Sequence, residues 1–198
     1  MATPSGEKPV ERLSIGELVC TSDHRAVPVK WVGRQTIAKV FAGERACLVR
    51  IEAGALGNHS DLYVTGDHGM VLDGYVVNAS ALVNGDNIDW VPYSETPERQ
   101  TVYHVETTDH EIILANGAAS ETYVDVTGRQ TFDNHQDYLD LYGAERTIAE
   151  MERPRISAQR LVPEAIKRKI GIVEKAIPGS TTDFSISHSS RATARTGA

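Results

Sequence analysis

The sequence lacks the features that mark several large classes of protein. No stretch approaches the ~20 consecutive apolar residues that a membrane-spanning helix needs, so we expect no membrane span. Lys and Arg form no basic run, and 27 Asp and Glu outnumber 20 Lys and Arg to give a net charge of -7. An acidic chain without a basic patch is not expected to bind nucleic acid or an anionic membrane.

Cysteine is scarce as well, because Cys20 and Cys47 are the only two in 198 residues. The first residues, MATPSGEKPVERL, do not show the basic and then apolar pattern of a secretory leader. We therefore expect free thiols in a reducing compartment, cytoplasmic by default, unless the chain is part of a longer secreted precursor. The glycine loops that bind phosphates or dinucleotides are also missing, and we expect no cofactor.

The sequence does contain many short segments rich in Val, Ile, Tyr and Thr. They predict strands at 27–32, 47–52, 61–64, 75–78, 101–106, 110–115 and 121–126. Turn-forming residues separate these segments, as at Asp73-Gly74 and Asn116-Gly117. No amphipathic helix of ~10–15 residues lies between them, so a parallel sheet is not expected. The pattern favours an all-β fold of short antiparallel strands.

Helical patterns are short, and the longer ones lie in the last third of the chain. A capping-box pattern at 14–17 and the run at 79–83 each predict about one helical turn. Later segments at 137–142 and 163–175 predict helices, of which the second is amphipathic and interrupted by Gly171.

Changes in composition along the chain suggest three parts. Residues 1–134 carry the β pattern, and we expect one β-rich domain there. Residues 135–177 are expected to form a helical extension. Residues 178–198 consist largely of Ser, Thr, Gly, Ala and Arg with little to bury, so we expect a disordered tail.

The first candidate site is the segment 64–70, VTGDHGM, between a predicted strand and a turn. Thr65 and His68 are three residues apart, so their side chains can meet over one loop. An imidazole titrates near neutral pH and can protonate a nitrogen or accept a proton. The pattern T-x-x-H also arises by chance, and a surface-turn histidine without a catalytic role is the alternative interpretation.

The second candidate site is the segment 102–111, VYHVETTDHE, which holds His104 and His110. His104 lies within a predicted strand, and its two neighbours point to the opposite face. Together with His68, these histidines provide three imidazoles, which is enough in number for a metal site. The H-x5-H spacing matches no zinc pattern and no cysteine pair supports it, so we expect no metal. The alternative for His104 is a hydrogen-bonded strand residue without a catalytic role.

Seven blocks of sequence, taken in order, carry a likeness to a known family. They lie at 3–23 (TPSGEKPVERLSIGELVCTSD), 28–37 (PVKWVGRQTI), 49–57 (VRIEAGALG), 61–74 (DLYVTGDHGMVLDG), 81–88 (ALVNGDNI), 101–125 (TVYHVETTDHEIILANGAASETYVD) and 128–134 (GRQTFDN). This series resembles the Hint module shared by hedgehog C-terminal domains and inteins, and most of all the bacterial Hint-domain proteins. Each block is ordinary by itself, whereas the ordered series is specific.

The resemblance implies a horseshoe-like, pseudo-twofold all-β fold that processes its own upstream polypeptide. In that chemistry a Cys at the start of the module attacks the preceding peptide carbonyl, and a second nucleophile cleaves the thioester that forms. Thr65 and His68 match the family's T-x-x-H, in which the His assists breakdown of the amide. His104 stands where inteins carry an Asp that positions or activates the nucleophile. His110 matches a His that is expected to assist the second step.

Two departures from the family pattern limit what we expect of this chain. The nucleophilic Cys of the family precedes the ATPSGE-like stretch, whereas this sequence starts at Met1 inside the first strand. We therefore expect an N-terminally truncated module that is inactive as written, with single-turnover self-cleavage if an upstream Cys exists. The His-Asn pair that ends splicing inteins is also missing after Asn116, so we expect cleavage rather than splicing with ligation.

Two other functions stay open from the sequence. The chain can be a non-catalytic Hint remnant that serves as a scaffold or binding module. It can also be an unrelated β-rich binding module, because a fold alone does not determine function.

Overall fold

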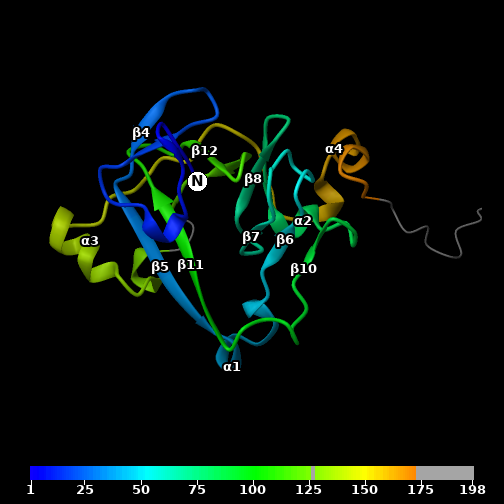
Figure 1. Cartoon of the computed structure of the whole chain (residues 1–198), viewed down its shortest axis with the longest axis horizontal. Helices are drawn as coiled ribbons and strands as arrows, with labels where there is room; N and C mark the ends of the chain where they lie inside the picture. Colours follow the sequence, from blue (N-terminus) through cyan, green and yellow to red (C-terminus); the bar gives the residue numbers. More distant parts are fainter. Residues whose placement is uncertain (126–127, 173–198) are drawn as a thin grey trace, which may run out of the picture.

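The computed structural model describes residues 1–125 and 128–172 (Figure 1). The strands are β1 (Ala2–Thr3), β2 (Gly6–Glu7), β3 (Leu18–Cys20), β4 (Ala26–Pro28), β5 (Trp31–Ala38), β6 (Val49–Ile51), β7 (Leu62–Val64), β8 (Gly69–Leu72), β9 (Tyr75–Asn78), β10 (Ile88–Trp90), β11 (Arg99–Glu106), β12 (Ile112–Ala115), β13 (Ala118–Glu121) and β14 (Arg155–Ile156). The helices are α1 (Lys39–Ala42), α2 (Ala79–Leu82), α3 (His135–Tyr142) and α4 (Glu164–Lys169), with 3-10 turns at Val10–Arg12, Gly43–Ala46, Arg129–Thr131 and Gln159–Leu161. The predicted all-β fold is confirmed, because strands in several sheets make up most of the regular structure.

Short antiparallel pairs dominate the sheets. The largest sheet has the order β12-β13-β8-β9-β14, and a second has the order β10-β6-β7. The pairs β11-β5, β3-β4 and β1-β2 form three further two-stranded sheets. Only β14 pairs in parallel, with β9, among the strands of the described residues. A parallel neighbour requires a long connection, and β14 therefore comes from a distant part of the chain.

The longest ladder joins β5 and β11, which run side by side toward α1 at the bottom of Figure 1. Its register extends from Arg99 opposite Ala38 to Glu106 opposite Trp31. Strands β4 and β12 and helix α3 lie on one side of the molecule, and β6, β7, β8, β10, α2 and α4 lie on the other (Figure 1). The five-stranded sheet connects the two sides, because it contains both β12 and β8.

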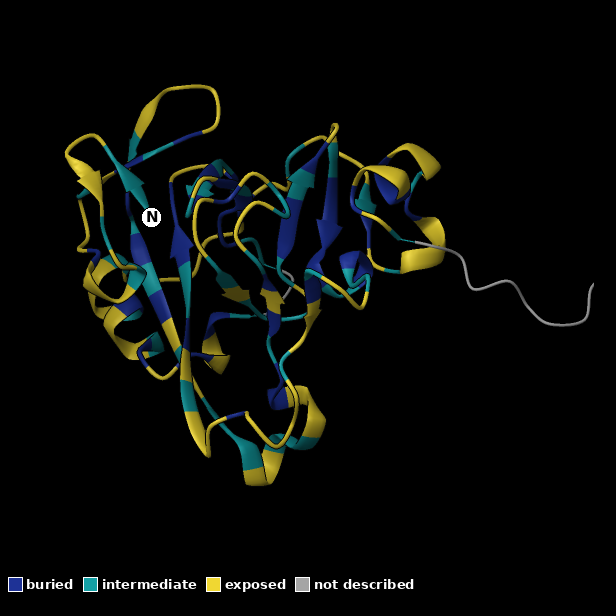
Figure 2. Cartoon of the chain, turned by 45° about the vertical axis from the view of Figure 1, so that its right-hand side comes forward, coloured by how far each residue is buried: buried dark blue, intermediate teal, exposed yellow. Residues whose placement is uncertain are grey.

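Three groups of buried side chains stabilise the fold: an aliphatic core, an aromatic core and a smaller cluster of Leu13, Val19, Val29, Val105 and Ile113. The aliphatic core consists of Val, Ile, Leu, Met and Ala side chains from β6, β8, β9, α2, β10, β13, β14 and α4, with Ile51, Met70 and Leu82 fully buried. The aromatic core consists of Trp31, Tyr123, Phe132, Tyr138 and Ile148. Buried residues follow the inner strands, whereas the outer turns are exposed (Figure 2). Removal of these apolar surfaces from water is the main source of stability, at roughly 25 cal/mol per Å².

The turn predicted at Asn116-Gly117 is confirmed. It is a two-residue connection between β12 and β13, in which Ala115 lies opposite Ala118. The φ angles of Asn116 and Gly117 are 49° and 90°, in the left-handed region that Asn and Gly adopt most easily. The turn chemistry therefore fixes the register of β13.

Most of the predicted strands have counterparts, but one of them is largely wrong. β9 has the predicted bounds, and β6, β7, β11 and β12 overlap their predictions. The strand predicted at 121–126 is wrong over 122–125, because β13 ends at Glu121 and the chain then leaves the sheet. The cause is tertiary: the Tyr123 side chain enters the aromatic core, and its N–H donates to the carbonyl of Val105 at 2.8 Å.

The helices predicted at 79–83 and 137–142 correspond to α2 and α3. The helix predicted at 163–175 is present as α4, which ends at Lys169 just before Gly171. The end of that prediction and the whole tail predicted at 178–198 lie outside the described residues. In the part of the chain that is described, no helix combines the length and the apolar character that crossing a membrane requires.

The helical turn predicted at 14–17 is wrong. The segment forms a hydrogen-bonded turn in which Glu17 N–H donates to the Ser14 carbonyl at 3.1 Å. Gly16 has a φ of 82°, which lies outside the right-handed helical region. Half of the expected capping box still forms, because the Ser14 N–H donates to Glu17 Oε2 at 3.1 Å.

Candidate functional site

A cleft of about 660 Å³ opens where the loop between β7 and β8 meets β5, β11 and the end of β13. Three of the four residues predicted from the sequence line it, namely Thr65, His68 and His104. Glu121 and Arg155 also line it, and they add one carboxylate and one guanidinium to the two imidazoles. The cleft therefore collects most of the groups that acid–base chemistry needs.

Backbone hydrogen bonds fix the loop that carries Thr65 and His68. The His68 N–H donates to the Thr65 carbonyl at 3.1 Å, which closes the turn between the two residues. The first turn of α2 holds the loop from the other side: Ala79 N–H donates to the His68 carbonyl and Ser80 N–H donates to the Gly66 carbonyl, both at 2.9 Å. These donors belong to the first turn of α2, where amides lack partners inside the helix. The T-x-x-H segment is thus held by its backbone.

The His68 ring is held by a buried serine. Its Nε2 lies 2.6 Å from the Oγ of Ser120 on β13. Burial lowers the pKa of His68 below its usual value, and Arg155 acts in the same direction, whereas the charge of Glu121 opposes them. At neutral pH the ring is therefore uncharged, the form in which one ring nitrogen can accept a proton.

His104 lies on β11 opposite Gly33, and aromatic rings surround it. Its ring centroid lies 6.1 Å from that of His68, 5.1 Å from that of Phe132 and 6.3 Å from that of Tyr123. Burial lowers the pKa of His104 to about 4, with a smaller contribution from His68 in the same direction. His104 is therefore uncharged over the whole physiological pH range.

Glu121 is the most heavily hydrogen-bonded group of the site. Its Oε1 accepts from the Gly69 N–H at 2.8 Å and from Arg155 at 3.0 Å. Its Oε2 accepts from Arg155 at 2.5 Å and lies 3.0 Å from His110 Nε2. Burial alone would raise the pKa of Glu121, but the hydrogen bonds from His110 and Arg155 outweigh it and lower the pKa to about 2. The carboxylate stays ionised and anchors the residue that follows His68.

The fourth predicted residue, His110, does not line the cleft, and both of its ring nitrogens have partners. Nδ1 accepts a hydrogen bond from the Met151 N–H at 3.0 Å. Nε2 therefore carries the proton of the neutral ring and donates it to Glu121. His110 is buried, and its hydrogen bond to Glu121 links it to the site.

Three partners in the site were not predicted from the sequence: Ser120, Glu121 and Arg155. Glu121 gave no usable signal, because the strand that buries it, Ala118–Glu121, was itself not predicted. Arg155 gave no signal, because it lies 34 residues from Glu121 in the sequence. Within the described residues, no group of three or more His, Cys, Asp or Glu side chains is arranged to hold a metal ion.

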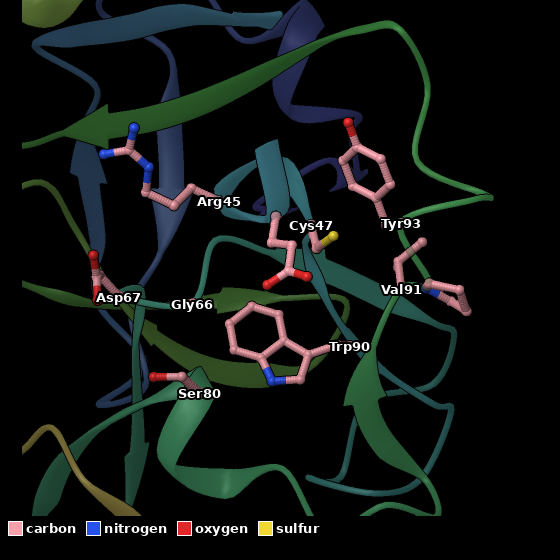
Figure 3. Close-up of a pocket in the computed structure, with 10 residues that line it drawn as sticks. Arg45, Cys47, Gly66, Asp67, Ser80, Trp90, Val91 and Tyr93 are labelled. Atoms are coloured by element: carbon pink, nitrogen blue, oxygen red, sulfur yellow. The ribbon is translucent and has the colours of Figure 1, made fainter. Parts of the chain in front are cut away.

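Neither cysteine lines the cleft. Cys20 lies in β3, and Cys47 is buried, where its Sγ accepts a hydrogen bond from Thr96 Oγ1 at 3.6 Å. Cys47 borders a second hollow of about 570 Å³, which shares Arg45, Gly66 and Asp67 with the cleft. The Trp90 indole projects into this hollow toward Gly66 and Ser80 (Figure 3).

Comparison with known proteins gives a family match over the part of the chain that holds the two histidines. A family model described as Hint domain matches residues 1–127. The crystal structure of the MchDnaB-1 intein and that of a variant of it are similar at 11% sequence identity, with TM-scores of 0.44 and 0.45. The similarity covers 61% and 62% of this chain and 93% and 95% of those chains. None of the curated protein sequences matches this chain.

Proposed function

The chain belongs to the Hint domain family, whose model matches its residues 1–127, and from this premise we propose that it is an autoprocessing domain. It cleaves the polypeptide ahead of the module through a peptide-to-thioester acyl shift begun by a cysteine thiol. The observation that carries the proposal is the shared cleft of Thr65, His68 and His104. Cys20 and Cys47 do not line that cleft, so the thiol is proposed to be supplied by a segment ahead of residue 1.

The reaction has two steps with different chemical needs. In the first step the sulfur attacks the carbonyl carbon of the preceding peptide bond, the C–S bond forms, and the C–N bond breaks as the nitrogen takes up a proton. In the second step water attacks the thioester, the C–S bond breaks, and the thiol is recovered. An amine is a poor leaving group without a proton donor, and a thiol is a poor nucleophile until it is positioned and deprotonated.

His68 is proposed to carry the proton to the leaving nitrogen. It takes a proton from the reacting groups and donates it to the amide nitrogen as the C–N bond breaks. The Ser120 hydroxyl at Nε2 holds the ring, and among the described residues Nδ1 has no hydrogen-bond partner. The hydroxyl of Thr65 is proposed to hydrogen-bond the peptide group that is cleaved, from the same loop.

His104 is proposed to position the nucleophile rather than to deprotonate it. A ring with a pKa of about 4 is a weak base towards a thiol, whose usual pKa is ~8.5. An uncharged imidazole can still accept a hydrogen bond from S–H and hold the sulfur in place. His110 is proposed to act one step away from the reaction, by orienting the Glu121 carboxylate.

A fusion protein tests the proposal. A reporter protein and a strand carrying a cysteine are placed ahead of residue 1, with the full chain unchanged, and release of the reporter is followed by gel and mass spectrometry. We expect single-turnover cleavage that hydroxylamine accelerates, because it attacks a thioester. Replacement of the added cysteine by Ala should abolish cleavage, and His68→Ala should slow it by about 10²–10⁴-fold.

The matched control is His135→Ala, because His135, at the start of α3, pairs with Glu145 and does not line the cleft. This variant should cleave at the rate of the unchanged fusion. If a folded fusion with the cysteine stays intact, the autoprocessing proposal is wrong, and the scaffold or binding function takes its place. If His68→Ala cleaves normally, the role given to His68 is wrong.

A further inference from the structure

The part of the chain that follows the family match returns to the cleft. The family model ends at residue 127, yet Phe132, Arg155 and Ser157 line the cleft beside His68 and His104. Residues from two parts of the chain therefore line the site, and only the part at 1–127 is covered by the family model.

Arg155 connects this segment to the site through the Glu121 carboxylate. Two of its nitrogens donate to the two oxygens of Glu121, at 3.0 Å to Oε1 and 2.5 Å to Oε2. Its Nε donates to Glu150 at 2.8 Å, which fixes the plane of the guanidinium. A bidentate contact of this kind sets the orientation of a carboxylate as well as its charge.

Three neighbouring contacts hold Arg155 in place. β14 pairs in parallel with β9, with Arg155 opposite Val76 and Ile156 opposite Val77. Ile156 belongs to the aliphatic core. The Met151 N–H donates to His110 Nδ1 at 3.0 Å, so the same segment also fixes the ring that donates to Glu121. The segment 150–157 therefore contacts the Glu121 carboxylate directly through Arg155 and indirectly through His110.

Glu121 in turn holds the loop that carries His68. Its Oε1 accepts from the Gly69 N–H, the amide that directly follows His68. A Cβ on Gly69 would lie 2.3 Å from Oε1, so the carboxylate fits closely against this backbone. The carboxylate is therefore in direct contact with the residue that follows His68.

We propose that Arg155 belongs to the reaction centre, as the residue that positions His68 through Glu121 and Gly69. This inference rests on the proposed function for its catalytic meaning, and on the contacts above for its geometry. Arg155 does not touch the reacting atoms, so it is a positioning residue. The functional unit accordingly extends past the family match to at least Arg155.

Arg155 also balances the charge around His68. The titratable and charged groups that face the cleft with His68 are Asp67 on its own loop, His104 on β11, Glu121 at the end of β13, Arg155 on β14 and Arg45. Arg155 offsets the negative charge of Glu121 near His68. Without Arg155, the Glu121 carboxylate would favour the protonated form of His68 more strongly. Loss of Arg155 should therefore shift the titration of His68 to higher pH.

The test uses the full-chain fusion with the added cysteine. Arg155→Ala should slow cleavage by about 10–100-fold, the usual effect of a displaced catalytic group, and should shift the pH profile of cleavage upward. Arg155→Lys keeps the charge without the bidentate contact, so it should restore the pH profile and only part of the rate. The matched control is Arg153→Ala, because Arg153 lies two residues away on the same segment and is exposed.

A second measurement separates this inference from the proposed function. The titration of His68 is followed by NMR in the chain without the added cysteine, where no cleavage occurs. Arg155→Ala should raise the midpoint, while Arg155→Lys and Arg153→Ala should leave it in place. A fusion that never cleaves, with this shift intact, overturns the autoprocessing function but not the link from Arg155 to His68.

The inference is overturned if the His68 titration is the same in Arg155→Ala and in the unchanged chain. It is also overturned if Arg153→Ala slows cleavage as much as Arg155→Ala does. If Arg155→Ala does not fold, the test uses the folded Arg155→Lys variant instead. Cleavage by Arg155→Lys at the rate of the unchanged fusion would show that the bidentate contact is not needed.

Discussion

The aliphatic core and the aromatic core stabilise the two histidines of the cleft in different ways. The aliphatic core contains only apolar side chains, and the loop with His68 is attached to it through the backbone of α2. The aromatic core encloses charges instead. Arg129 and Glu106 are completely buried and 2.8 Å apart, and the guanidinium of Arg129 lies 4.8 Å from the ring of Tyr123 and 4.5 Å from that of Tyr138.

The difference lies in what each core tolerates. An apolar core loses stability in proportion to the volume that is removed, whereas a buried ion pair fails sharply when one partner is lost. His104 packs against Phe132 of the aromatic core, so its position depends on the core that contains the buried ion pair. We therefore expect changes near His104 to unfold the protein more readily than equivalent changes under His68.

Arg129→Met gives the largest expected effect. It leaves Glu106 buried without its main partner, which costs about 3–5 kcal/mol of unfolding free energy. Denaturant unfolding at neutral pH measures the loss. The control Arg34→Met removes an exposed arginine that pairs with Asp137, and it should cost less than about 1 kcal/mol. Equal losses in the two variants would show that the buried pair has no special weight.

Gly69→Ala tests the contact between Glu121 and the His68 loop. The new Cβ would lie 2.3 Å from Glu121 Oε1 and 2.5 Å from Val76 Cγ1, so we expect a loss of about 1–3 kcal/mol and slower cleavage. Gly66→Ala, on the other side of His68, meets the Trp90 ring at 2.6 Å. Trp90 is 41% exposed and can turn away, so this control should cost clearly less. The prediction is wrong if Gly66→Ala is the more damaging change.

The pH dependence of stability tests the burial of His104. Its pKa falls from 6.5 to about 4 on folding, so between these values the unfolded chain binds a proton that the folded protein does not. Stability should therefore fall by about 1–3 kcal/mol as the pH drops from 6.5 to 4. His104→Gln should make this part of the curve less steep, and His68, whose pKa burial also lowers, should account for the slope that remains. If stability falls with pH as steeply in this variant as in the unchanged protein, His104 is not the group responsible.

A second acid transition follows from Glu121. The pKa of Glu121 is 4.5 in an unfolded chain and about 2 in the folded protein. The stability that the ionised carboxylate contributes above pH 4.5 is therefore lost as the pH falls toward 2. Glu121→Gln should remove the transition at lower pH and leave the one between pH 6.5 and 4. Chemical denaturation at a series of pH values resolves the two.

Ile51→Val gives the smallest expected effect and tests the tolerance of the aliphatic core. Ile51 is fully buried in the aliphatic core, and loss of one methylene costs about 0.5–1.5 kcal/mol. Cleavage by the fusion with the added cysteine should stay unchanged, because the His68 loop is held by backbone hydrogen bonds to α2. A large loss of cleavage in a folded Ile51→Val variant would contradict this separation.

Local sequence was sufficient for part of the fold and part of the site. The hairpin at Asn116-Gly117 was predictable because two residues with positive φ determine the turn. The turn from Thr65 to His68 was predictable because a spacing of three residues allows one backbone hydrogen bond to close it. The strand at Ala118–Glu121 was missed, because Ala and Ser favour strands weakly and only the pairing with β12 and β8 stabilises it.

The sequence by itself determined the class of the fold and several of its turns, and it indicated Thr65, His68, His104 and His110 as candidates for one site. Only the tertiary structure decided how these groups are used. It turned His104 into the cleft and kept His110 out of it, and it brought Ser120 to His68 across 52 residues and Arg155 to Glu121 across 34. The reason is that contacts between distant segments depend on which surfaces pack together, and burial then sets the charge state of each group.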